Sequence, residues 1–141
     1  MKPFSINKVI DLRIGFAGGI VMGIIVFVIN YRHTGLVEGA LTAALKQGIY
    51  TFFFGGLIMK LCESIAVRLD PAFLALVLAM LIPSILSLGL TYGVHSLKGT
   101  PMPMESTVPT AFFVIPSTLV WGIVKRKKRD QTISEKDRQN H

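Results

Sequence analysis

The stretch IGFAGGIVMGIIVFVINY, residues 14–31, contains no charged side chain and is bounded by Arg13 and Arg32. A helix needs about 20 mostly apolar residues to cross a hydrocarbon core roughly 30 Å thick. With its flanks the stretch meets this length, and it is too long for the apolar part of a typical cleaved signal peptide. We therefore predict a membrane-spanning helix over about residues 12–31.

Three further stretches extend this pattern along the chain. Residues 71–94 and 106–124 carry no charged side chain and each predicts another span. The span predicted over about residues 40–60 is less regular, because Lys46 and Lys60 bound its uncharged part, but lysine can extend its ammonium toward the headgroups. The helix that contains it is expected to start near Gly35 and to continue to Leu69. The sequence thus predicts an all-α fold, an integral membrane protein with four transmembrane helices in a compact antiparallel bundle.

The overall composition agrees with a membrane protein. Of 141 residues, 51% are hydrophobic and only 16% are charged, whereas soluble domains carry roughly 25% charge. The net charge of +7 comes from cations that flank the apolar runs, so anionic lipid headgroups, and not nucleic acid, are the expected partner. The single cysteine excludes an intrachain disulfide.

Lysine and arginine should be enriched on the cytoplasmic side of the spans. They gather before the first span, between the second and third, and after the fourth, while Arg32 and Lys98 fall on the other side. This distribution predicts that both termini are cytoplasmic, in the inner (plasma) membrane. The basic and polar tail, residues 125–141, is predicted to be disordered.

Small residues and prolines indicate how the spans pack. Gly15, Gly19 and Gly23 recur every four residues and therefore share one face of the first helix, where they allow another backbone to approach closely. The partner is either another helix of the same chain or a second copy of the protein. Pro83 is expected to kink the third helix, and two prolines are expected to interrupt the fourth, Pro109 and Pro116.

The run KRKKR directly follows the fourth span and is the strongest local signal in the sequence. Five consecutive cations at this position attract an anionic leaflet and also fix the orientation of the span. The residues predicted to contact anionic lipid are Lys125, Arg126, Lys127, Lys128 and Arg129.

A few polar residues at membrane depth are candidates for a transport path. Glu38, Lys46 and Gln47 lie in or near the second span, and an ionisable group at that depth is a functional hypothesis by default. They predict a polar strip that faces a cavity. Under the alternative interpretation, Lys46 extends outward to the headgroups and Glu38 occupies the first helical turn, where the macrodipole favours an acid.

His33, His95 and Glu105 all fall on the predicted outer side, where they are candidates for an acid–base or metal cluster. They lack a metal-ligand spacing, so the sequence predicts no metal, no cofactor and no enzyme. The function expected is a non-enzymatic accessory or scaffold subunit that acts through helix–helix contacts, with a second copy or another membrane protein as partner. The alternative is a small transporter or channel subunit.

Overall fold

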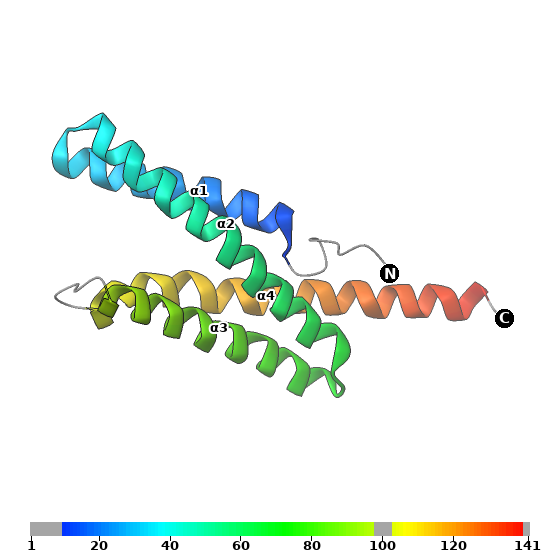
Figure 1. Ribbon diagram of the computed structural model, residues 1–141. Coiled ribbons are helices and arrows are strands. Elements are labelled where there is room, and N and C mark those ends of the chain that lie inside the picture. Colours follow the sequence, from blue (N-terminus) through cyan, green and yellow to red (C-terminus); the bar gives the residue numbers. More distant parts are fainter. Residues whose placement is uncertain (1–9, 98–102, 140–141) are drawn as a thin grey trace, which may run out of the picture. The chain divides into compact units, whose positions relative to one another are not determined.

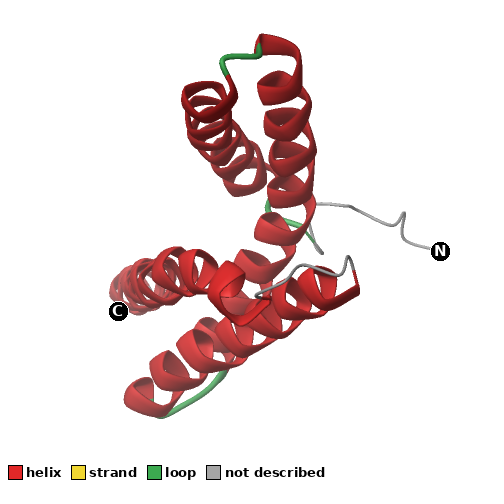
Figure 2. Cartoon of the chain, turned by 90° about the vertical axis from the view of Figure 1, so that its left-hand side faces the viewer, coloured by secondary structure: helices red, strands yellow, loops and turns green. Residues whose placement is uncertain are grey.

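The computed structural model describes residues 10–97 and 103–139 of the chain. Within these ranges it is all-α and contains no strand (Figures 1 and 2). The four helices are α1 (Leu12–Thr34), α2 (Val37–Arg68), α3 (Ala72–Leu97) and α4 (Pro103–Gln139). Each contains a segment that is long and apolar enough to cross a membrane. The predicted all-α class with four spans is therefore confirmed, as expected for a multi-pass membrane protein.

The chain divides into two compact units, Met1–Lys60 and Leu61–His141, called here the N-terminal unit and the C-terminal unit. Helix α2 contributes its first part to one and its last part to the other. In the N-terminal unit, α1 ends at Gly35, which adopts a left-handed conformation with φ of 69°. Its backbone N–H bonds to the carbonyl of Tyr31. Glycine suits this position because it lacks a Cβ, and the chain reverses there into α2.

The glycine strip of α1 lies against α2 in the same unit. A Cβ at Gly19 would stand 2.8 Å from the carbonyl oxygen of Gly48, and one at Gly15 would collide with the carbonyl of Phe52. Further along, Gly23 faces the carbonyl of Ala44. Contacts in this reversed order make α1 and the first part of α2 antiparallel. The partner of the strip in this structure is thus a helix of the same chain.

In the C-terminal unit, α3 and α4 pack along each other, together with the end of α2. Cys62 of α2 is buried and its thiol donates to the carbonyl of Thr118 at 3.1 Å. The Thr118 hydroxyl lies 3.1 Å from that of Ser84 on α3. Gly122 lies near Ala79, so the contacts again run in reversed order. Hydrogen bonds of this kind satisfy polar groups where no water is available.

Helix α2 extends beyond the predicted span at both ends, close to the expected limits of Gly35 and Leu69. Helix α4 differs from the prediction, because it runs unbroken through both of its prolines and then through residues predicted to be disordered, as far as Gln139. Adding residues to an existing helix is far easier than starting one. The Arg126–Asp130 pair, four residues apart, supports the extension.

Asp70 also differs from its expected role. The sequence Asp-Pro is typical of a helix start, with Asp70 as N-cap and Pro71 as the first helical residue. In the structure α3 begins at Ala72, and the Asp70 carboxylate binds two arginines of α4 instead. The same two arginines also bind carbonyls at the end of α2, a few residues before Asp70.

Candidate functional site at the end of α2

The last turn of a helix leaves carbonyl groups without intrahelical partners. At the end of α2 these carbonyls receive hydrogen bonds from α4. Arg126 donates to the carbonyl of Ala66 at 3.1 Å and also to that of Leu69. Arg129 donates to the carbonyl of Val67 at 2.8 Å. Two guanidinium groups from one helix thus cap the C-terminus of another, where the macrodipole also favours positive charge.

The same two arginines hold the turn that follows α2. One carboxylate oxygen of Asp70 accepts from Arg126 at 2.7 Å and from Arg129 at 3.3 Å. Arg126 is buried, with 7% of its surface exposed, whereas the Asp70 carboxylate is largely open to solvent. We call Arg126, Arg129, Asp70 and the capped carbonyls the arginine clamp. It joins α2, the α2–α3 turn and α4 within the C-terminal unit.

The clamp persists at neutral pH. Hydrogen bonds from Arg126, and then from Arg129, lower the pKa of the Asp70 carboxyl below its ordinary value. A carboxyl with a lowered pKa stabilises the fold at every pH above its ordinary pKa of about 3.9, and that stabilisation is lost as the pH falls through the lowered value. Only strongly acidic conditions therefore weaken the contact with Asp70.

A third cation of the basic run is also engaged. The Lys125 ammonium lies 3.0 Å from a carboxylate oxygen of Glu63 on α2 and 4.6 Å from the centre of the Trp121 ring. An ammonium over an indole face is attracted by the ring quadrupole. In contrast, Lys127 and Lys128 are exposed and form no ion pair within the described part of the chain.

The cations of the basic run thus differ in their contacts within the fold. The sequence predicts lipid contact for all five, which stays a prediction, and three of them also bind other residues of the protein. A signal for this was present, because positions three apart share one face of a helix, and Arg126 and Arg129 are so related. Their acceptors lie about 60 positions earlier, and nothing in the local sequence identifies them.

No protein-family model, curated protein or solved structure matches this chain. The interpretation of its sites therefore depends on their own geometry.

The residues of the predicted polar path are only partly brought together. Glu38, Thr42 and Lys46 line one surface hollow along the first turns of α2. The side-chain amide of Gln47 donates to the Thr51 hydroxyl at 3.2 Å and does not line this hollow. Glu38 lies in the first turn of its helix, as the alternative interpretation expected.

The predicted outer-face cluster stays a prediction, because its histidines belong to different units of the chain. His33 is exposed at the end of α1 in the N-terminal unit, and His95 belongs to α3 in the C-terminal unit. The side chain of Glu105 lies outside the described residues. Among the side chains that are described, no three His, Cys, Asp or Glu residues are grouped so that they could hold a metal ion.

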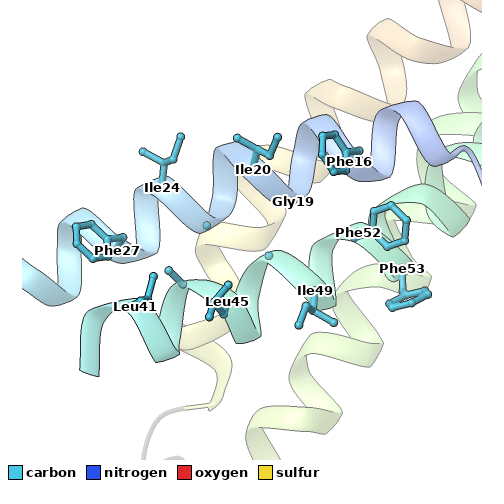
Figure 3. Close-up of a pocket in the computed structure, with 13 residues that line it drawn as sticks. Phe16, Gly19, Ile20, Ile24, Phe27, Leu41, Leu45, Ile49, Phe52 and Phe53 are labelled. Carbon is cyan, nitrogen blue, oxygen red and sulfur yellow. The ribbon is translucent and has the colours of Figure 1, made fainter. Parts of the chain in front are cut away.

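The N-terminal unit carries a groove that the sequence did not predict. It runs between α1 and α2, encloses about 710 Å³ and is lined only by apolar residues (Figure 3). Phe16 and Ile24 of α1 stand along one side, and Leu45 and Ile49 of α2 along the other. Its floor contains the small residues of the helix contact, Gly19, Gly23, Ala44 and Gly48.

Proposed function

We propose that this protein is a non-enzymatic accessory or scaffold subunit of the inner membrane, with both termini in the cytoplasm, and that it acts through helix–helix contacts. The observation that carries the proposal is the apolar groove between α1 and α2. The distribution of lysine and arginine along the sequence supports the orientation.

The groove suits a further transmembrane helix. Association in a membrane depends on close van der Waals packing, which small residues permit because they let backbones approach. The small residues at the floor of the groove bring α1 and α2 close together, so the large side chains on either side form its walls. Phe16 is 63% exposed and Ile24 is 59% exposed, so both can surround an inserted helix. The groove therefore offers a partner helix apolar contact and shape complementarity.

The use of polar groups elsewhere supports the same proposal. Cys62 bonds to the carbonyl of Thr118 and Ser84 bonds to its hydroxyl, both across helices, and the arginine clamp fixes the end of α2. These polar side chains hold helices together, as expected of a protein whose role is to present a fixed helical surface.

Site-specific photocross-linking in native membranes tests the proposal. A photoreactive amino acid at Ile24, which lines the groove, is expected to give an adduct with a membrane protein or with a second copy. Val21 is the matched control, because it is 54% exposed on the same helix and does not line the groove. Lipid adducts alone at both positions would contradict the proposal.

A transporter or channel subunit is the second candidate. It is favoured by one observation, that Glu38 and Lys46 line the same hollow with Thr42 between them. Oppositely charged groups at membrane depth commonly mark ion or proton pathways.

Cysteine accessibility tests this second candidate. In a Cys62→Ser background, Lys46→Cys is expected to react with a membrane-impermeant thiol reagent if position 46 lines an aqueous path. Leu41→Cys is the control, because Leu41 lies on the same helix in the apolar groove. If position 46 is as unreactive as position 41, and Lys46→Met behaves like the parent protein, the transport function is rejected.

A further inference from the structure

The cations that follow α4's apolar segment fall into two groups. Lys125, Arg126 and Arg129 face α2 and its following turn and have acidic or carbonyl partners there. Lys127 and Lys128 are exposed, and neither forms an ion pair among the residues that the structure describes. At 100° per residue, they occupy sectors of the helix away from Arg126.

The two exposed lysines lie at a boundary between apolar and polar surface. Ile123 and Val124 immediately precede the basic run and are themselves exposed apolar residues. Helix α4 then continues as a fully polar helix past the start of α3, except for Ile133 (Figure 1). In a membrane this boundary corresponds to the depth of the lipid headgroups, where a flexible lysine side chain can reach a phosphate.

A hollow beside Lys127 also has an apolar end and a polar end. It encloses about 640 Å³, and Leu76 of α3 and Ile123 of α4 line its apolar end. Arg126, Lys127, Gln131, Ser134 and Arg138 continue the lining. Two acids, Asp130 and Glu135, also line it, and Asp130 lies within 3.4 Å of an Arg129 nitrogen. The apolar end suits the start of an acyl chain, and the Lys127 ammonium suits an anionic headgroup.

We propose that Lys127 binds the phosphate of an anionic phospholipid in the leaflet where α4 leaves the membrane, with the lipid's acyl end beside Leu76 and Ile123, and that the exposed Lys128, outside the hollow, attracts the same leaflet. Lysine suits this contact because its compact ammonium is mobile on a long stem. The other three cations of the run hold the protein together, and Arg126, which also lines the hollow, is engaged by an α2 carbonyl and by Asp70. This inference does not depend on the scaffold function.

Energy transfer from Trp121 tests the proposal on the whole chain. Trp121 is the only tryptophan and lies less than two turns before Lys127. In lipid nanodiscs, transfer to dansyl-labelled phosphatidylserine is expected to exceed transfer to dansyl-labelled phosphatidylcholine. Lys127→Gln with Lys128→Gln should lower this preference by up to about fivefold per lysine at low salt. Circular dichroism of each variant verifies that the helices are retained.

The control removes the same charge elsewhere. Arg32→Gln with Lys136→Gln is expected to leave the preference unchanged, because Arg32 lies in the last turn of α1 and Lys136 lies in the last turn of α4, away from the boundary at Val124. An unchanged preference in the Lys127 and Lys128 double variant, or an equal loss in the control, would overturn the proposal. Inorganic phosphate, compared with chloride at equal ionic strength, should not remove the preference. If it does, the lysines bind free phosphate and the lipid assignment is wrong.

Discussion

Replacing Arg126 with methionine is expected to lower the free energy of unfolding of the C-terminal unit by at least about 3 kcal/mol. The variant loses hydrogen bonds from a charged donor to two carbonyls and to Asp70. Such bonds contribute about 1.5–3 kcal/mol each, and leaving a buried acceptor without a partner adds to the loss. The exposed Asp70 carboxylate is hydrated in the variant, so the loss of its bond to Arg126 adds little to the total loss of stability.

Denaturant unfolding in detergent micelles, followed by Trp121 fluorescence, measures this loss. Lys128→Met is the matched control, because it removes the same charge from an exposed position on the same helix and should change stability by less than about 0.5 kcal/mol. Arg126→Lys should recover only part of the loss, since one ammonium cannot reproduce the geometry of the guanidinium. Equal stability of the Arg126→Met and Lys128→Met variants would show that the clamp does not stabilise the unit.

Replacing Gly19 with leucine is expected to separate α1 from α2 and to destabilise the N-terminal unit by about 3 kcal/mol, the upper end of the usual effect of overpacking. Even the Cβ would lie 2.8 Å from the Gly48 carbonyl oxygen, which is backbone and cannot move aside alone. Because the strip faces α2 of the same chain, the loss should appear as reduced stability and not as a change in oligomer size.

Hydrogen exchange of α1 amides in micelles measures this effect, with the oligomer size determined in parallel. Gly39→Leu is the control in the same unit, because a Cβ at Gly39 meets nothing within 4 Å. Unchanged protection of α1 in the Gly19→Leu variant, combined with a smaller oligomer, would place the contact of the strip between copies instead.

The spans were predictable because their signal is local. Residues 14–31 and 71–94 are uncharged over enough length to cross a bilayer, and α1 and α3 cover them. The end of α4 was less predictable than the spans. The polar residues after Val124 resemble a disordered tail by composition, yet they continue a helix that has already formed.

The arginine clamp was not predictable from the sequence alone. A run of cations after a span is typical of lipid contact and orientation, and that pattern is the same whether a given arginine faces lipid or protein. What assigns Arg126 and Arg129 to the protein is the end of α2, where free carbonyls and Asp70 lie within reach. Only the folded arrangement of α2 and α4 brings these groups together.

Because α4 is one unbroken helix, it fixes the position of any group attached to its end. From Lys125 to Gln139 the helix rises about 21 Å at 1.5 Å per residue, so backbone geometry fixes the distance of Gln139 from Lys125. Its direction is fixed as well. Deleting one residue from this segment would lower the end by only about 1.5 Å but rotate it by about 100° around the axis. A deletion would therefore change the direction in which a group fused there points far more than its distance along the helix axis.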